Sequence, residues 1–234
     1  MKQILGIIPA RGGSKRIPRK NKRNFVDKPL VAWGIESALG AKRLDQIVVT
    51  SDDNDILKIA ESYPLIYPIK RPSEISGDKS PAIDYIKHAL QILEKNDEKK
   101  YKIIVILQPT SPLTISEDID GTIELLEKSN ADTAVSVVRL DHAIQPSKLK
   151  IMKDSRIYPY IEEENGRMAA HELPEIFIRN CSVYASNRYV IDQDIIIGND
   201  CRGYIMPRER SIDINDEFDF QLAEFLINKK IKNL

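Results

Sequence analysis

Near the N-terminus an uninterrupted apolar run leads into a loop of glycines and basic residues: Gln3-Ile4-Leu5-Gly6-Ile7-Ile8-Pro9-Ala10-Arg11-Gly12-Gly13-Ser14-Lys15-Arg16-Ile17-Pro18-Arg19-Lys20-Asn21. The apolar run from Gln3 to Pro9 predicts a buried strand, because the strands of a parallel sheet are covered on both faces and lack alternating polar residues. The loop after such a strand opens at the carboxyl end of the sheet, where α/β proteins bind their ligands. The stretch therefore predicts an α/β fold with a ligand-binding loop after its first strand.

The loop combines two glycines with a dense set of cations. Gly12 and Gly13 permit positive φ and allow backbone N–H groups to converge on an anion. The basic residues of this region are Arg11, Lys15, Arg16, Arg19, Lys20, Lys22 and Arg23. The loop matches neither the Walker pattern nor the dinucleotide pattern GxGxxG. We interpret it as a polyphosphate-binding loop of another kind.

Two other interpretations of these charges are a solvated basic surface and a nucleic-acid patch. The whole chain is neutral, with 35 Lys and Arg residues against 35 Asp and Glu residues, whereas a nucleic-acid binder is more often basic overall. The glycines beside the charges also favour a bound anion. We therefore expect no nucleic-acid partner.

The composition suits one α/β domain of 234 residues, with room for a small appendage. No apolar stretch approaches the roughly 18 residues of a membrane span, and the N-terminus lacks a signal-peptide pattern. Cys181 and Cys201 show no CxxC spacing, which fits a reducing compartment. We expect a cytoplasmic protein without a membrane partner, and the scattered histidines predict no histidine-based metal site.

Apolar runs that predict strands alternate with amphipathic segments that predict helices. The expected strands lie at 3–9, 47–50, 65–67, 102–107, 133–138, 182–185 and 204–206. The expected helices begin at Pro29, Asn54, Ser80–Pro81, Thr114 or Ser116, and Asn215 or Asp216. This alternation requires a mostly parallel sheet, so the fold class is α/β.

The alternation stops between Arg139 and Ile178. A structureless loop of that length is improbable inside a compact domain. We expect a small antiparallel excursion that covers the site or pairs with a second subunit. Residues 1–138 and 179–234 would then form the α/β domain, with 139–178 inserted.

Two later segments also suggest ligand contacts. Gln108, Thr110 and Ser111 follow the strand at 102–107 and offer hydrogen bonds without charge, although a structural turn is the alternative. Asp213 alternates with isoleucines before the last helix, where a carboxylate needs a partner. A hard cation such as Mg²⁺ facing the phosphate loop would supply one.

These segments together resemble a known family. The stretch from Ile8 to Asn21 resembles the signature of the acylneuraminate cytidylyltransferases, the CMP-sialic acid synthetases, which include CMP-legionaminic acid synthetases. Further matches follow in the expected order: Thr50-Ser51-Asp52, Arg71-Pro72-Ser73-Glu74, Gln108-Pro109-Thr110-Ser111-Pro112, Leu173-Pro174, Asn180 with Tyr184, and Ser211-Ile212-Asp213.

The resemblance implies an enzyme that couples CTP to a nonulosonic 2-keto sugar acid, giving a CMP-sugar and pyrophosphate. It implies a Rossmann-like three-layer sandwich of the nucleotide-diphospho-sugar transferase type, with a small inserted dimerisation subdomain in a homodimer. The implied nucleotide site comprises Arg11, Gly12, Gly13, Ser14, Lys15, Lys20, Asn21, Arg71 and Ser80. The implied sugar site comprises Gln108, Arg167, Arg179 and Asn180, and the implied Mg²⁺ ligands are Asp213 and Asn215. The implied catalytic residues are Arg11, Lys20 and Asp213.

In this chemistry the anomeric hydroxyl attacks the α-phosphorus in line and pyrophosphate leaves, which needs positioning and charge neutralisation more than a covalent nucleophile. The general base is either Asp213 or a metal-activated hydroxyl. Two residues depart from the family pattern: Asn215 stands where many members have aspartate, and Ala170 stands where sialic-acid members have arginine. Arg167 or Arg179 is the expected substitute for that arginine. The second departure favours legionaminic acid or another bacterial nonulosonic acid.

The alternatives are a cytidylyltransferase for pseudaminic or octulosonic acid, a nucleotidyltransferase for a sugar 1-phosphate, and a non-catalytic nucleotide-binding protein. An acceptor panel separates the enzymes from one another. Binding of CTP without pyrophosphate release would identify the binding protein.

Overall fold

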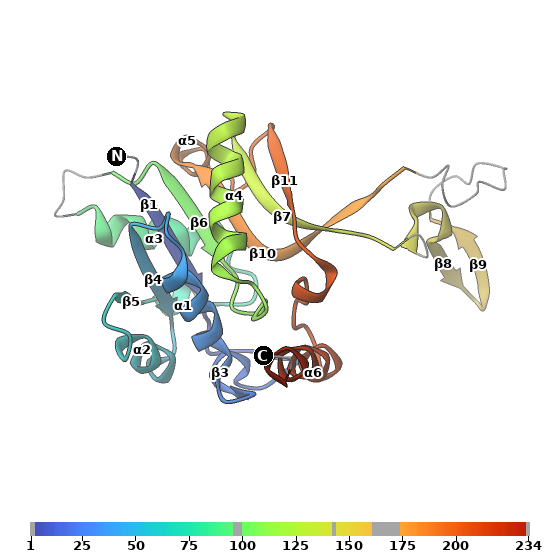
Figure 1. Ribbon diagram of the computed structural model, residues 1–234, viewed down its shortest axis with the longest axis horizontal. Coiled ribbons are helices and arrows are strands. Elements are labelled where there is room, and N and C mark those ends of the chain that lie inside the picture. Colours follow the sequence, from blue (N-terminus) through green and yellow to red (C-terminus); the bar gives the residue numbers. More distant parts are fainter. Residues whose placement is uncertain (1–2, 96–99, 142–143, 161–173, 233–234) are drawn as a thin grey trace.

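A seven-stranded sheet in the order β11-β7-β10-β6-β1-β4-β5 forms the centre of the computed structural model, which describes residues 3–95, 100–141, 144–160 and 174–232 (Figure 1). The strands are β1 (Ile4–Pro9), β4 (Gln46–Ser51), β5 (Ile66–Lys70), β6 (Ile103–Leu107), β7 (Thr133–Arg139), β10 (Phe177–Asn187) and β11 (Cys201–Ile205). Neighbouring strands pair in parallel except at β10, which is antiparallel to both β6 and β7. The mostly parallel sheet confirms the predicted fold class.

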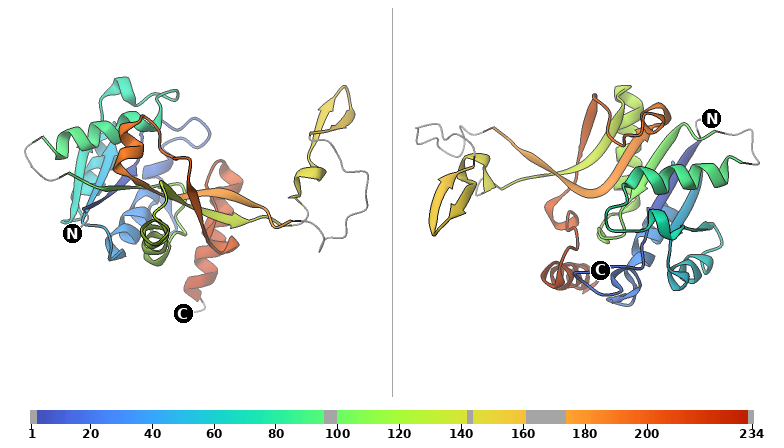
Figure 2. Two further views of the ribbon diagram at one scale, coloured as in Figure 1. Left: turned by 90° about the horizontal axis from the view of Figure 1, so that it is seen from above. Right: turned by 180° about the vertical axis from the view of Figure 1, so that it is seen from behind.

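Helices cover both faces of this sheet (Figure 2). Helices α1 (Leu30–Gly40), α2 (Asn54–Glu61) and α4 (Ser116–Ser129) contribute to one apolar core, whereas α3 (Ala82–Leu93) and α5 (Arg188–Asp192) contribute to another. Strand β1 supplies both cores, since Ile4 and Ile8 lie in the first and Leu5 and Ile7 in the second. Its uninterrupted apolar sequence is therefore explained by burial on both faces.

A third core lies beneath the last helix, α6 (Glu217–Lys232). Phe25, from the short hairpin of β2 (Asn24–Phe25) and β3 (Lys28–Pro29), packs edge-on against Trp33 at 5.7 Å and Phe220 at 5.2 Å between ring centroids. The sequence patterns did not predict this hairpin. It anchors the end of the basic loop to the C-terminal helix.

The expected antiparallel excursion contains a hairpin of β8 (Lys150–Lys153) and β9 (Arg156–Pro159), which projects from the body of the molecule in Figures 1 and 2. Strands β7 and β10 approach it together, and Phe177 pairs with Arg139 at the far end of their ladder. Strand β10 therefore begins earlier than expected. The division of the chain into two units remains a prediction.

In the part of the chain that the structure describes, no helix has both the length and the apolar character needed to cross a membrane.

Candidate functional site

A cavity of about 640 Å³ lies at the carboxyl ends of β1 and β6, and it gathers most of the residues singled out from the sequence. Those that line it are Arg11, Gly13, Ser14, Lys15, Lys20, Asn21, Arg71, Ser80, Gln108, Asp213 and Asn215. Arg179 lines a neighbouring cavity, and Arg167 and Ala170 lie outside the described residues. Residues far apart in the sequence thus converge where the sheet topology places a ligand.

The basic loop is held by hydrogen bonds to the adjacent strand end. The backbone N–H of Gly12 donates to Asp52 Oδ1 at 2.8 Å, and Asn21 Nδ2 donates to the carbonyl of Arg11 at 2.9 Å. A Cβ atom at Gly12 would lie only 2.7 Å from the Cβ of Asp53, so close approach requires glycine there. Neither glycine of the loop adopts the positive φ that glycine permits; Arg19 instead takes the left-handed conformation, with φ of 58°.

Six of the seven cations of the loop divide into two groups, and the seventh, Arg19, is exposed and does not line the cavity. Arg11, Lys15, Arg16 and Lys20 line the cavity. Lys22 instead forms ion pairs of 2.8 Å with Asp53 and Asp55, and Arg23 pairs with Glu217 at 2.7 Å. The charge pattern alone indicated the cluster but not the acidic partners of Lys22 and Arg23, because those partners come from distant segments.

Asp78 contacts two of the cations that face the cavity. Arg11 Nη1 lies 2.5 Å from Asp78 Oδ1, and Lys15 pairs with the other carboxylate oxygen. Lys15 and Arg11 hold the pKa of Asp78 below its usual value. The Asp78 carboxylate therefore forms ion pairs with the same cations that a phosphate group would bind.

Lys20 lies deeper in the cavity than Lys15. Its ammonium donates to the carbonyl of Ile214 at 2.6 Å, next to Asp213. Burial lowers the pKa of Lys20; the Asp213 carboxylate opposes this shift, and Arg16 and Arg11 add to it. A buried cation with a nearby carboxylate can stabilise charge that develops on a leaving phosphate.

Arg71 is the buried cation of the site, with 5% of its surface exposed. Its Nη2 donates to the carbonyl of Thr50 at 2.9 Å, and its guanidinium carbon lies 4.7 Å from the centre of the Tyr85 ring. Burial lowers the pKa of Arg71. The guanidinium is thus held in a fixed plane against the wall of the cavity, as recognition of a planar polar group requires.

Asp213 and Asn215 are the candidate metal ligands. Asn215 Nδ2 donates to Asp213 Oδ2 at 2.9 Å, so the amide presents its nitrogen to the carboxylate. Among the described residues, no group of three or more His, Cys, Asp or Glu side chains is placed to hold a metal ion. Mg²⁺ often takes one or two protein carboxylates and completes its shell with substrate phosphates and water, and this donor set fits that mode.

The neighbouring cavity, of about 470 Å³, is more apolar. It shares Tyr85, Gln108 and Tyr184 with the first cavity, and burial raises the pKa of Tyr184. The isoleucines in its lining are Ile83, Ile106, Ile195, Ile196 and Ile197. Arg179 and Asp194 give this lining one charge of each sign, and Asp194 is already paired with Lys87. The sequence analysis missed the isoleucine run, although three successive isoleucines in a loop were a visible signal.

Asn180 lines neither cavity. Its side chain is 4% exposed and bonds to Ser136 and Ser211 inside the protein. Its predicted contact with a sugar remains untested.

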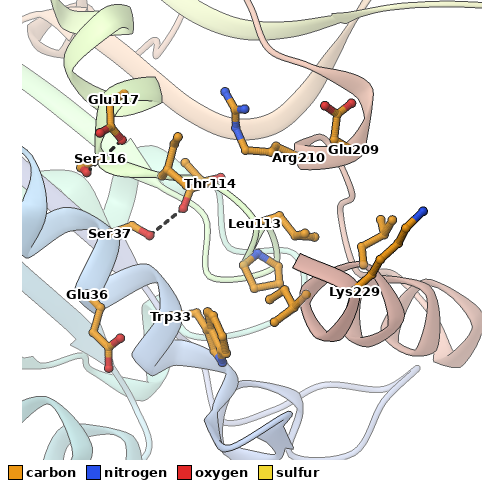
Figure 3. Close-up of a pocket in the computed structure, with 14 residues that line it drawn as sticks. Trp33, Glu36, Ser37, Leu113, Thr114, Ser116, Glu117, Glu209, Arg210 and Lys229 are labelled. Atoms are coloured by element: carbon orange, nitrogen blue, oxygen red, sulfur yellow. Dashed lines mark hydrogen bonds between the residues drawn. The ribbon is translucent and has the colours of Figure 1, made fainter. Parts of the chain in front are cut away.

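A third cavity, of about 780 Å³, lies between α1, the segment 112–117 and α6 (Figure 3). Its lining includes the acids Glu36, Glu117 and Glu209 and the cations Lys229 and Arg210, and Arg210 is already paired with Asp118. This charge balance does not suit a polyphosphate. The cavity beside the basic loop is therefore the candidate active site.

Comparisons with known proteins agree with this geometry. A cytidylyltransferase family model matches residues 5–231. The N-acylneuraminate cytidylyltransferase of Escherichia coli is 31% identical over 97% of this chain, which spans 53% of that enzyme's length. Two Campylobacter jejuni proteins are each 28% identical: a pseudaminic acid cytidylyltransferase, with 95% of each chain covered, and a CMP-N,N′-diacetyllegionaminic acid synthase, with 100% of this chain and 98% of that protein covered.

Solved structures support the fold. A CMP:2-keto-3-deoxy-manno-octonic acid synthetase superposes with a TM-score of 0.71 at 16% identity, covering 98% of this chain and 100% of that one. A 4-diphosphocytidyl-2C-methyl-D-erythritol synthase superposes with a TM-score of 0.65 at 12% identity, covering 97% and 100%. Since the family model spans nearly the whole chain and the basic loop lies in a strand-end cavity, the chain belongs to the cytidylyltransferase family, as the sequence predicted.

Proposed function

We propose that this chain transfers the cytidylyl group of CTP to the anomeric hydroxyl of a nonulosonic 2-keto sugar acid, giving a CMP-sugar and pyrophosphate. The observation that carries the proposal is the meeting of Arg11, Lys15, Lys20 and Asp213 in one cavity, directly beside an apolar cavity that contains Arg179. The first cavity suits a nucleoside triphosphate and the second suits an acidic sugar. The named activities of the relatives point in the same direction.

The basic loop would bind the triphosphate. Arg11 and Lys15 turn from Asp78 to the outer phosphates, and Lys20 neutralises charge on the departing pyrophosphate. Asp213 and Asn215 would hold Mg²⁺, which when bound neutralises phosphate charge and orients the leaving group. Arg71 and Ser80 would contact the cytosine, and Asn21 the ribose.

Two routes are open for the proton of the attacking hydroxyl: transfer to Asp213, or loss from a hydroxyl activated by the metal that Asp213 would hold. Asp78, the other carboxylate that lines the described cavity, is paired with two cations, whereas Asp213 accepts a hydrogen bond from the neutral Asn215 amide. The sugar oxygen then attacks the α-phosphorus, the bond from phosphorus to pyrophosphate breaks, and pyrophosphate leaves with its charge neutralised.

The acceptor would occupy the apolar cavity. Arg179 can pair with the sugar's carboxylate, Gln108 can bond to a hydroxyl, and the isoleucines can contact methyl or acyl substituents. These features favour legionaminic acid or another acylated bacterial nonulosonic acid.

We further propose a homodimer formed through the β8–β9 hairpin. Each face of this hairpin carries one solvent-exposed apolar pair: Met152 with Ile157 on one face, and Ile151 with Tyr158 on the other. Exposed apolar surface of this kind marks interaction sites. The molar mass in solution tests the proposal; wild type is expected at twice the mass of Ile157→Glu, and a monomeric wild type would oppose it.

Pyrophosphate release with CTP and Mg²⁺ over a panel of nonulosonic acids tests the proposed reaction. One acceptor should give release, and Asp213→Ala should reduce the rate by roughly 100-fold or more, as loss of a main electrostatic contributor does. Binding of CTP with no release from any acceptor would favour a nucleotide-binding protein. Recovery of activity in Asn215→Asp would then identify Asn215 as the cause.

A further inference from the structure

We propose that Asn180 is a positioning residue that joins the wall of the acceptor cavity to the segment carrying Asp213. The inference rests on the proposed function, because it assigns Asn180 a role in arranging that site. This positioning role differs from the direct contact with the sugar that the family resemblance implies for Asn180.

The first observation is the interruption of the β7–β10 ladder around Asn180. Arg179 pairs with Val137, and the next pair along the ladder joins Tyr184 to Val135. Because this step covers more residues in β10 than in β7, β10 contains extra residues here. Cys181 within the bulge has φ of 59°. Arg179 lines the apolar cavity, Cys181 lines the cavity beside the basic loop, and Tyr184 lines both. The bulge therefore sets where these cavity residues lie.

The second observation is that the Asn180 amide is fully used inside the protein. Its Oδ1 accepts from Ser136 Oγ at 2.6 Å and from the backbone N–H of Ser182 at 3.4 Å. Its Nδ2 donates to Ser211 Oγ at 2.9 Å and to Met206 Sδ at 3.2 Å. Since both amide hydrogens and the oxygen are engaged, this side chain offers no donor to a bound sugar.

The third observation is the position of Ser211 in the chain, shortly before Asp213. Two residues later comes Asp213, and then Ile214, whose N–H donates to the carbonyl of Thr110 at 2.8 Å. Asp213 therefore lies between two residues that hydrogen bonds hold in place, Ser211 and Ile214. Loss of the Asn180–Ser211 bond would remove the anchor that joins this segment to β10, while Arg210 would still join it to α4 and Ile214 to Thr110.

The requirement for an amide follows from these partners. An aspartate at 180 has the same shape, but when ionised it cannot donate to Ser211. A residue that orients a metal ligand typically contributes about 10- to 100-fold to metal affinity or activity. Substitution at Asn180 should therefore act through Asp213, even though Asn180 does not line the cavity.

The test compares Asn180→Asp and Ser211→Ala with a control in the same bulge, Ser182→Ala. Ser182 is also buried, at 1% exposure, and its hydroxyl bonds to the Asn180 carbonyl at 3.5 Å, away from Ser211. Mn²⁺ binding to the CTP-loaded protein is measured by titration calorimetry, alongside kcat and KM. Asn180→Asp and Ser211→Ala should weaken Mn²⁺ binding and lower kcat by roughly tenfold or more each, with KM for CTP within about twofold. Ser182→Ala should lower the melting temperature but leave Mn²⁺ binding unchanged.

Combining Asn180→Asp with Ser211→Ala should add little to the effect of either single variant on Mn²⁺ binding, because both remove the bond that the Asn180 amide donates to Ser211. Unchanged Mn²⁺ binding and kcat in Asn180→Asp and Ser211→Ala would overturn the inference. A rise in KM for the sugar alone would also overturn it, in favour of direct sugar contact. If the wild type binds Mn²⁺ and CTP but couples no acceptor, the proposed function fails, while the Mn²⁺ measurements still decide the role of Asn180.

Discussion

The ion pair between Asp118 and Arg210 offers a stability test of how the C-terminal segment is held. Asp118 in α4 is fully buried, at 0% exposure. Arg210 reaches it from the short 3-10 helix η5 (Arg208–Arg210) and donates through Nε at 3.0 Å and Nη2 at 2.7 Å. Arg210 directly precedes Ser211, so this pair fixes the start of the segment that leads to Asp213.

Replacing Arg210 with methionine would keep much of its aliphatic bulk and leave the Asp118 carboxylate buried without a counter-charge. Breaking a buried pair in this way costs about 3–5 kcal/mol. Because the Arg210 side chain is 23% exposed, the lower end applies, about 3 kcal/mol. For a domain of this size that corresponds to a fall in melting temperature of roughly 6–12 °C.

The assay is urea unfolding at neutral pH, with Arg208→Met as the matched control. Arg208 lies two residues earlier in the same short helix, is 74% exposed and lies 3.5 Å from Asp141, so its loss should cost less than about 1 kcal/mol. The double variant Asp118→Asn with Arg210→Met should recover part of the loss, because it removes the uncompensated charge. A change below about 1 kcal/mol in Arg210→Met would refute the reasoning.

Three further predictions concern the basic loop. Burial lowers the pKa of Lys20 from the ordinary value of 10.5, so its charge is present below that lowered pKa and is lost as pH rises through it. We therefore expect kcat/KM for CTP to fall at a lower alkaline pH than an exposed lysine would give. Lys20→Arg should abolish this alkaline decrease in the pH profile of kcat/KM. Asp78→Asn should free two cations for phosphate and lower the Kd for CTP by about two- to fivefold in titration calorimetry, whereas an unchanged Kd would contradict the competition. Gly12→Ala should cost roughly 1–3 kcal/mol in urea unfolding because its Cβ meets Asp53 at 2.7 Å, whereas Gly13→Ala, with nothing within 4 Å, should cost less.

The sequence predicted the sheet and the meeting of most candidate residues in one cavity, for a physical reason. Strands buried on both faces must be continuously apolar, so β1 and β6 are visible as runs such as Ile103–Leu107. Parallel strands bring their carboxyl ends to one edge, so Arg11 and Gln108 could be expected to meet although they are distant in sequence.

Other features depend on partners that a local pattern does not contain. The local charge pattern did not distinguish Lys22 from Lys20, because the partners of Lys22, Asp53 and Asp55, lie across a tertiary contact. Only the family resemblance placed Lys20, and not Lys22, at the nucleotide site. It did not predict that β10 runs antiparallel, since a short apolar run carries no direction. The role of Asn180 was equally hidden, because its bonds reach Ser136, Ser182, Met206 and Ser211 on both sides of it in the chain.

The most direct test of the proposed reaction is separation of the products formed from CTP, Mg²⁺ and each nonulosonic acid in turn. The account predicts that one acceptor yields a CMP-sugar and pyrophosphate in equal amounts, and that Asp213→Ala yields little of either. Bound CTP that gives no CMP-sugar with any acceptor, or full product formation by Asp213→Ala, would contradict it.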